Sequence, residues 1–334
     1  MSNAKQPLIL IVGPTAVGKT EIAIQLGELM EGEIISADSR LFYRGMDIGT
    51  AKPSLEERER LPHHLIDIAD PDEILSLAVF QKLAHTAISD IQARDKLPIL
   101  VGGTGQYIRA VTEGWTPPEV KPNPGLRDEL EKIAFRHHHA TEGGMETNHS
   151  NITGKEWLHE KLNSFDPEAA NNIDSRNLRR TIRALEVILT TGRKFSEQRG
   201  QGAALYDLIT IGLSRPRIEL YARIDERIES MFKAGLLSEA KALLAKGYSA
   251  NLPTMSAIGY RESIKVVEGK WSVEEAKIAM RRATRAFVRR QANWFKESDP
   301  NIKWFEVRRG VEKEIETYIR GNPVALKSSK SANA

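Results

Sequence analysis

Hydrophobic and polar positions alternate in blocks along the first third of the chain. Three short apolar runs are typical of buried strands: "LILIV" (8–12), "EIISAD" (33–38) and "LPILVGGTG" (97–105). The segments 18–30 and about 72–94 carry apolar residues at helical spacing, and the first should bury Ile22, Leu26 and Leu29. Strands that alternate with helices predict an α/β fold with a mainly parallel sheet covered on both faces.

This alternation stops at the proline-rich stretch "GWTPPEVKPNPG" (114–125). The residues that follow are polar and helical, and 136–154 lacks any period and is interpreted as a loop. A strand returns at "YDLITIGL" (206–213), and helical residues then lead to a last strand, "IKWFEV" (302–307). We predict three parts: a catalytic core (6–114 and 201–310), a helical insertion domain (115–200), and a C-terminal helix with a disordered tail (311–334).

The composition excludes several classes of protein. The 334 residues include no cysteine, which excludes disulfides, cysteine-ligated zinc and a thiol nucleophile. No apolar run approaches the roughly 18 residues that span a bilayer, and the first residues lack a secretory signal pattern. We therefore expect a cytoplasmic protein with no membrane partner.

Positive charge is concentrated in two blocks although the net charge is only +3. Between Arg176 and Arg199 there are seven Lys/Arg and two acids, and between Arg281 and Lys296 there are six Lys/Arg and no acid. Such blocks favour a polyanion as partner. Either block alone is equally compatible with a solvated helix face.

The stretch "GPTAVGKT" matches the phosphate-binding pattern G-x-x-x-x-G-K-[ST] between a strand and a helix. Its glycines let backbone N–H groups line one hollow, and the helix adds its positive N-terminal end. The core is therefore expected to be P-loop NTPase-like, with Lys19 on the outer phosphates and Thr20 as a ligand of Mg²⁺. The pattern predicts a di- or triphosphate ligand and leaves open whether it is ATP. The residues assigned to it are Gly13, Pro14, Thr15, Ala16, Val17, Gly18, Lys19 and Thr20.

Asp38 follows the second predicted strand, at the sheet edge where α/β proteins bind ligands. Its carboxylate is a candidate metal ligand, general base or ribose contact. Aspartate is also a good helix N-cap, and "DSRL" is a plausible helix start. The position of Asp38 alone does not decide between these roles.

Eight motifs together resemble those of the bacterial tRNA dimethylallyltransferase family. In chain order they are "GPTAVGKT" (13–20), "ADSRLFYRGMDIGTAKP" (37–53), "HHLID" (63–67), "LVGGTGQY" (100–107), "RRTIRALEV" (179–187), "RIDERIESM" (223–231), "SAIGYRE" (256–262) and "RRQANWF" (289–295). The resemblance implies that dimethylallyl diphosphate, and not ATP, occupies the loop. The acceptor would be N6 of the adenosine 3′ to the anticodon, within the tRNA anticodon stem-loop, and the protein would act as a monomer.

The resemblance also implies roles for particular residues. Asp38 would accept the N6 proton, since an adenine amino group is a poor nucleophile until it is deprotonated. Thr15 and Lys19 would act on the donor, with Mg²⁺ on Thr20. Arg223 and Arg227, four residues apart on one helical face, would add positive charge at the diphosphate. An ion-pair stripe with neighbouring acids is the alternative for this pair.

The expected tRNA contacts combine the basic blocks with the matching motifs. Spacing places Arg282, Arg285, Arg289 and Lys296 on one helical face. Thr104 is alternatively a helix N-cap. The full set of expected contacts is Asp38, Ser39, Arg40, Leu41, Thr104, Arg127, Arg179, Arg180, Thr181, Ile182, Arg183, Gly259, Tyr260, Arg261, Arg282, Arg285, Arg289 and Lys296.

Two departures from the family pattern and three rival functions accompany this hypothesis. Leu41 stands where the family more often has Gln, and "NIDSRNLRR" replaces a commoner motif. The rivals are an ATP-dependent small-molecule kinase, a prenyltransferase of free adenine nucleotides, and a non-catalytic RNA-binding protein. The kinase and the nucleotide prenyltransferase do not account for the basic blocks. The RNA-binding protein does not account for the Lys-Thr pair and Asp38.

Overall fold

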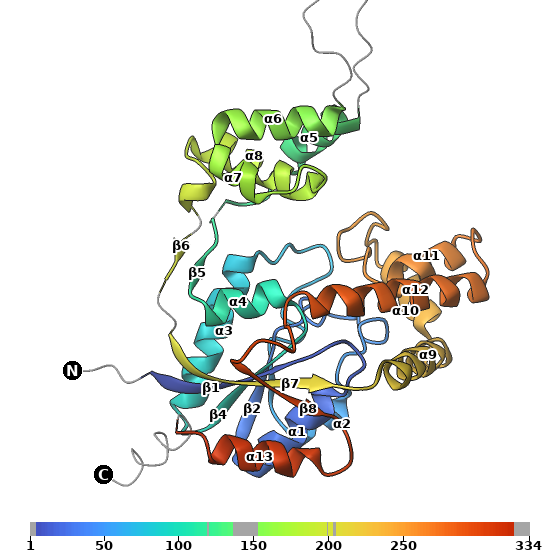
Figure 1. Ribbon diagram of the computed structural model, residues 1–334. Helices are drawn as coiled ribbons and strands as arrows, with labels where there is room; N and C mark the ends of the chain where they lie inside the picture. Colours follow the sequence, from blue (N-terminus) through green and yellow to red (C-terminus); the bar gives the residue numbers. More distant parts are fainter. Residues whose placement is uncertain (1–4, 119, 136–152, 199, 203–204, 324–334) are drawn as a thin grey trace, which may run out of the picture. The chain divides into compact units, whose positions relative to one another are not determined.

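The computed structural model describes residues 5–118, 120–135, 153–198, 200–202 and 205–323 (Figure 1). The chain forms two compact units, unit 1 with residues 1–114 and 203–334 and unit 2 with residues 115–202. Most of the predicted loop at 136–154 and the predicted disordered end of the chain lie outside the described residues.

Unit 1 is built on a six-stranded sheet in which all neighbouring strands are parallel. This sheet confirms the predicted α/β class, and it adds one short strand, β3, that the sequence pattern did not indicate. Across the sheet the order is β3 (His63–His64), β2 (Gly32–Ser36), β4 (Leu97–Val101), β1 (Gln6–Val12), β7 (Tyr206–Ser214) and β8 (Ile302–Glu306).

The central strand β1 supplies buried side chains to both faces of the sheet. Leu8, Leu10 and Val12 join one hydrophobic cluster, and Ile9 and Ile11 join another. Successive side chains of a strand point to opposite faces, so an uninterrupted apolar run requires cover on both. The run "LILIV" therefore specifies a strand at the middle of a two-sided sheet.

Helices lie on both faces of this sheet (Figure 1). α3 (Leu77–Gln92) and α4 (Gly105–Thr112) pack on one face, and α1 (Lys19–Met30) and α13 (Val311–Arg320) pack on the other. The prediction that Leu29 of α1 faces inward is wrong, because its side chain is 41% exposed. At 100° per residue, the buried arc of α1 is centred near Ala23, which puts Leu29 at its margin.

The predicted helical region 217–296 divides into four helices. They are α9 (Arg217–Lys233), α10 (Leu236–Ala245), α11 (Tyr260–Val267) and α12 (Val273–Ala292), and a short helix, α2 (Leu55–Arg60), lies earlier in the unit. Gly235, at φ 99°, separates α9 from α10. None of the helices in the described residues combines the length and apolar composition that a membrane span requires.

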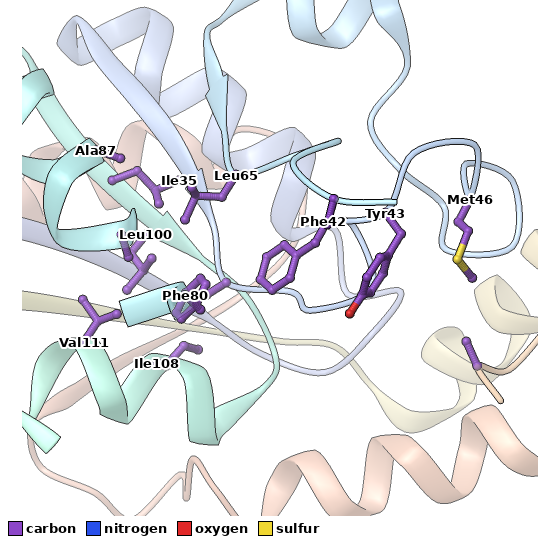
Figure 2. Close-up of a cluster of buried hydrophobic side chains, with 14 of the residues drawn as sticks. Ile35, Phe42, Tyr43, Met46, Leu65, Phe80, Ala87, Leu100, Ile108 and Val111 are labelled. Atoms are coloured by element: carbon purple, nitrogen blue, oxygen red, sulfur yellow. The ribbon is translucent and has the colours of Figure 1, made fainter. Parts of the chain in front are cut away.

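The segment 38–53 contains little regular secondary structure, yet buried side chains hold it in place (Figure 2). Phe42 is fully buried and stacks on Phe80 of α3, with ring centroids 5.4 Å apart and an interplanar angle of 21°. Tyr43 and Met46 are buried farther along the segment. A chain anchored at these side chains keeps one conformation without hydrogen-bond ladders of its own.

Unit 2 is a helical bundle with its own hydrophobic core. Its elements are α5 (Pro124–Phe135), α6 (Gly154–Phe165), α7 (Pro167–Asn172), α8 (Leu178–Thr191), the 3₁₀ turn η1 (Ser196–Gln198), and a two-stranded antiparallel ribbon of β5 (Trp115–Thr116) and β6 (Gly200–Gln201). Leu130, Leu158, Leu162 and Leu185 belong to the core. α8 ends at Gly192, at φ 68°, as its sequence predicts.

Candidate active site

Four loops of unit 1 meet at one edge of the sheet because the strands that precede them are parallel neighbours. β2, β4, β1 and β7 are consecutive in the sheet. Asp38 follows β2, the glycine-rich residues 102–105 follow β4, the phosphate-binding pattern 13–20 follows β1, and Arg215 follows β7. The carboxyl edge of an open α/β sheet is where such proteins bind ligands, so this edge is the candidate site.

The backbone of the loop 13–18 adopts conformations that only certain residues tolerate. Gly13 has φ 151°, and a Cβ at that position would lie 2.6 Å from the carbonyl oxygen of Leu213. Gly18 is the N-cap of α1 at φ 110°. The first N–H groups of α1 lack acceptors within the helix, and they carry the positive end of its dipole. The loop therefore offers N–H donors to an anion, and its binding of a phosphate stays a prediction.

Cationic side chains hold the carbonyl groups of the same loop. Lys19 Nζ donates to the carbonyls of Gly13 (3.0 Å) and Pro14 (2.8 Å). Arg223 Nε donates to the carbonyl of Ala16 (2.9 Å), and Arg215 Nε donates to that of Val17 (3.0 Å). Arg215 was missed by the sequence analysis, although an arginine directly after a predicted strand of a parallel sheet was a usable signal.

Asp38 and Arg227 lie close enough to Lys19 to affect its pKa. Burial lowers the pKa of Lys19 to about 8, the Asp38 carboxylate raises it, and Arg227 lowers it. Burial likewise lowers the pKa of Arg227, against the attraction of Asp38. The Arg227 guanidinium also donates to the Thr50 carbonyl (3.5 Å). Two cations and one carboxylate therefore converge beside the loop.

Asp38 lies at a turn that its own side chain closes. Its Oδ1 accepts the Arg40 N–H (3.0 Å), and residues 39–42 form turns, so the helix N-cap alternative for Asp38 is wrong. The carboxylate lines a small pocket of about 60 Å³. The pocket walls include Lys19, Thr20, Leu41, Pro53, His63 and Ile66.

His63 also lines this pocket, and the sequence analysis quoted its motif without giving it a role. Its Nδ1 donates to the carbonyl of Leu61 (2.7 Å), and its Nε2 has no hydrogen-bond partner in the described part of the chain. Burial lowers the pKa of His63, which favours the neutral ring. Nε2 is therefore a buried acceptor on a residue that lines the pocket.

Other predicted contact residues lie near Asp38 or in the helical part of unit 1. Ser39, Arg40 and Leu41 are half-buried beside it. Thr104 is the N-cap of α4, but its side chain makes no capping hydrogen bond. Gly259 is buried and at φ 102°, and the next residues place Arg261 on the surface in an ion pair with Glu262 (2.5 Å).

The prediction that the side chain of Tyr260 contacts tRNA is wrong, because Tyr260 is fully buried. Its hydroxyl donates to Glu239 (2.5 Å), and the same carboxylate accepts the backbone N–H groups of Asp47, Ile48 and Gly49. Tyr260 and Glu239 thus hold the backbone of the loop 46–50 in place through hydrogen bonds.

A buried lysine supports the same segment from within. Lys52 Nζ lies 2.5 Å from both Asp47 and Asp67 and donates to the Tyr43 carbonyl (2.8 Å). Its side chain is 1% exposed, so both carboxylates are needed to compensate its desolvation. The motif 37–53 therefore includes residues of this ion-pair network in addition to Asp38.

The basic residues of α12 are not equivalent. Arg282, Arg289 and Lys296 are exposed and form no ion pair within the described residues. Arg285 instead donates to both oxygens of Asp225 in α9 (2.9 and 2.7 Å), with its guanidinium 4.9 Å from the Tyr221 ring centroid. Arg285 therefore has an ion-pair partner that its helical spacing did not indicate, and its contact with a phosphate stays a prediction.

In unit 2, the predicted contact residues also separate into two groups. Arg127 and Arg183 bind the fully buried carboxylate of Glu186 (2.7 and 2.6 Å). The pKa of Glu186 is lowered because these arginines and the Asn123 N–H outweigh the opposing effect of burial. The two arginines therefore have a structural role in the core of unit 2.

The other members of this set differ in exposure. Thr181 and Ile182 are buried, so contact with tRNA through their side chains is a prediction that the structure contradicts. They occupy the core-facing side of α8. Arg179 and Arg180 are exposed, and they keep the predicted surface position.

The described residues contain no cluster of three His, Cys, Asp or Glu that could hold a metal ion. Mg²⁺ is commonly bound by one or two protein oxygens together with substrate phosphates and water. The Thr20 hydroxyl and the Asp38 carboxylate, which line one pocket, are compatible with that mode. They do not form an all-protein site.

The fold and this loop define the class as an α/β P-loop protein with an anion site at the carboxyl edge of the sheet. A family model described as IPP transferase matches residues 41–298. The chain belongs to the IPP transferase family, and the resemblance inferred from the sequence motifs is confirmed. It is accordingly a transferase enzyme.

Individual relatives cover nearly the whole chain. A Roseiflexus castenholzii protein named tRNA dimethylallyltransferase is 51% identical over 296 residues, 89% of this chain and 91% of that protein. The solved tRNA isopentenylpyrophosphate transferase of Bacillus halodurans is 38% identical, with a TM-score of 0.68 and coverage of 99% and 100%. A eukaryotic dimethylallyltransferase acting on tRNA is 26% identical, with a TM-score of 0.74 and coverage of 94% and 77%.

Lys19 makes the affinity for a diphosphate pH-dependent. Its pKa is about 8 in the ligand-free protein, and a bound diphosphate raises it, so binding above pH 8 requires uptake of a proton. We expect the logarithm of the affinity for dimethylallyl diphosphate to fall by up to about one per pH unit above pH 8. Titration calorimetry without tRNA from pH 6.5 to 9.5 measures this.

Lys19→Met is the control for this titration, because it should bind more weakly but lose no further affinity as the pH rises. An affinity of the unmodified protein that stays constant across the range would contradict the assignment of Lys19 to the diphosphate.

Proposed function

We propose that the protein transfers the dimethylallyl group of dimethylallyl diphosphate to N6 of the adenosine 3′ to the anticodon in tRNA. The observation that carries this proposal is the convergence of Lys19, Arg227 and Asp38 beside the loop 13–18. An anion site and a carboxylate at one place suit a reaction that releases diphosphate and removes a proton. Membership in the IPP transferase family supports the same reaction.

The loop stabilises the leaving group. As the bond between C1 of the dimethylallyl group and the bridging oxygen breaks, negative charge grows on the diphosphate. The N–H groups at the start of α1, Lys19, Arg223 and Arg227 are preorganised to stabilise this charge. Mg²⁺ at Thr20 would further neutralise the diphosphate when bound.

Asp38 removes the proton from the acceptor. As the N6–C1 bond forms, the amino group transfers a proton to the carboxylate, and the nitrogen lone pair becomes available for the new bond. The Arg40 N–H on Oδ1 orients the carboxylate and leaves Oδ2 for the amino group. The target base must leave its stack to reach Asp38, as bases do in other base-modifying enzymes.

The tRNA backbone is proposed to lie against exposed basic side chains that form no ion pair within the described residues. Those proposed are Arg282, Arg289 and Lys296 in unit 1 and Arg179 and Arg180 in unit 2. Ser39, Leu41, Thr104, Gly259 and Arg261 complete the proposed contacts. Phosphate contacts provide affinity and orientation, and the selection of the base falls to the pocket at Asp38.

One assay tests the proposed function against its rivals. Radiolabelled dimethylallyl diphosphate is supplied with tRNA, AMP or ATP in separate reactions, and label in the product and ADP release are both measured. We expect label only in tRNA and no ADP. Label in AMP would favour a prenyltransferase of free nucleotides, ADP release would favour a kinase, and no reaction at all would favour a non-catalytic RNA-binding protein.

Asp38→Asn should reduce the single-turnover rate by about 10²–10⁴, with tRNA affinity nearly unchanged. The amide oxygen of the Asn still accepts the Arg40 N–H, so the turn persists, but the side chain accepts no proton. Asp70→Asn is the matched control, since Asp70 forms a surface pair with Arg44 (3.0 Å). A rate for Asp38→Asn within about threefold of the unmodified enzyme would remove the general-base role.

Arg282→Gln combined with Arg289→Gln should weaken tRNA binding and flatten its salt dependence by roughly 0.7–0.9 log–log units per lost contact. Arg285→Gln is the control on the same helix. Its charge is already paired with Asp225, so the slope should not change. Filter binding over a series of salt concentrations measures both, and equal slopes in the double variant and the unmodified enzyme would count against this tRNA surface.

A further inference from the structure

We propose that Gln291 is a positioning residue for the donor, because it fixes the peptide group between Pro14 and Thr15. This inference rests on the proposed function. Gln291 lies near the end of α12 and is 6% exposed. Its Oε1 accepts the Thr15 N–H (2.8 Å), and its Nε2 donates to the Gly103 carbonyl (3.2 Å). The side chain therefore joins α12 to two loops of the site.

The amide of Gln291 satisfies both partners at once. The Thr15 N–H requires an acceptor, and the Gly103 carbonyl requires a donor. A carboxylate at position 291 would meet the first requirement and fail the second, and a thioether would meet neither. Glycine is required at position 103 for this contact, since a Cβ there would overlap the Gln291 amide nitrogen.

The consequence for the donor follows from the planarity of the peptide bond. The Pro14 carbonyl and the Thr15 N–H belong to one planar group. Lys19 Nζ holds its oxygen (2.8 Å), and Gln291 holds its N–H (2.8 Å). Without the Gln291 contact, the plane is held at its carbonyl oxygen by Lys19 (2.8 Å) and the Val17 N–H (3.4 Å) but no longer at its N–H, so we expect it to tilt. The peptide group that Lys19 contacts is thus positioned by a residue 276 positions from Thr15 in the sequence.

The same helix end also packs against the glycine-rich residues after β4. Trp294 lies against Gly105, its ring centroid is 5.4 Å from the Arg109 guanidinium, and its carbonyl accepts from Arg109 (3.4 Å). The glycine-rich turn that carries the Gly103 carbonyl is therefore itself held. Gln291 and Trp294 give the motif "RRQANWF" a role on the donor side, in addition to the proposed tRNA contacts of Arg289 and Lys296.

The test measures binding of dimethylallyl diphosphate without tRNA by titration calorimetry for Gln291→Met and Gly103→Ala. Gln291→Met has a similar shape and makes neither hydrogen bond, and Gly103→Ala displaces the amide without changing α12. Both should weaken binding by about three- to tenfold, the effect of one hydrogen bond. In steady-state assays both should raise the KM for dimethylallyl diphosphate and leave the KM for tRNA unchanged, a split that a loss of folded protein would not produce.

Met280→Ala is the matched structural control. Met280 is buried on α12, and its truncation should lower the melting temperature without changing donor affinity. A donor affinity and a donor KM that match the unmodified protein in both test variants would overturn the role of Gln291 and leave the proposed function intact. If the unmodified protein itself fails to bind dimethylallyl diphosphate, the proposed function fails, and the role of Gln291 fails with it.

Discussion

The site depends on the polarity of one short stretch of backbone. In the loop 13–18, Lys19, Arg215 and Arg223 hold the carbonyl groups, while the N–H groups at the start of α1 remain for an anion. Without these cations, the carbonyl dipoles would repel the negative charge that the N–H groups attract. The buried Lys19 illustrates the electrostatic cost of this arrangement, since burial lowers its pKa to about 8. A bound diphosphate restores the favourable environment of the charged lysine, so ligand binding and lysine protonation are coupled.

The carboxylate at position 38 needs equally firm support, because an irregular segment carries it. Phe42 is buried against α3, Lys52 pairs with Asp47 and Asp67, and Glu239 with Tyr260 holds the backbone of 47–49. Each contact replaces part of what a helix or strand would provide through its own hydrogen bonds. This is the physical reason that the motif extends from 37 to 53, although one carboxylate performs the proposed chemistry.

Arginine content by itself does not define a nucleic-acid surface. Arg127 and Arg183 compensate the buried Glu186 in unit 2, and Arg285 compensates Asp225 in unit 1. Four other arginines are exposed and form no ion pair in the described part of the chain: Arg179, Arg180, Arg282 and Arg289. The distinction matters for mutagenesis, because removing a member of the first group takes one partner from a carboxylate, which leaves Glu186 with one arginine or Asp225 with Arg281 (3.8 Å). Only the second group reports on RNA binding.

The sequence alone determined the α/β class, the parallel strands, the phosphate loop, the family and the candidate carboxylate. These features arise from patterns within a few tens of residues, such as the apolar run 8–12 and the spacing from Gly13 to Thr20. Only the tertiary structure decided that Leu29 is exposed, that Thr181, Ile182 and Tyr260 are buried, and that Arg285 is paired. It alone brought Arg215 and Gln291 to the loop, because helical spacing identifies a face without saying what covers it. The contact between Thr15 and Gln291 joins residues 276 positions apart, a separation at which no local pattern carries information.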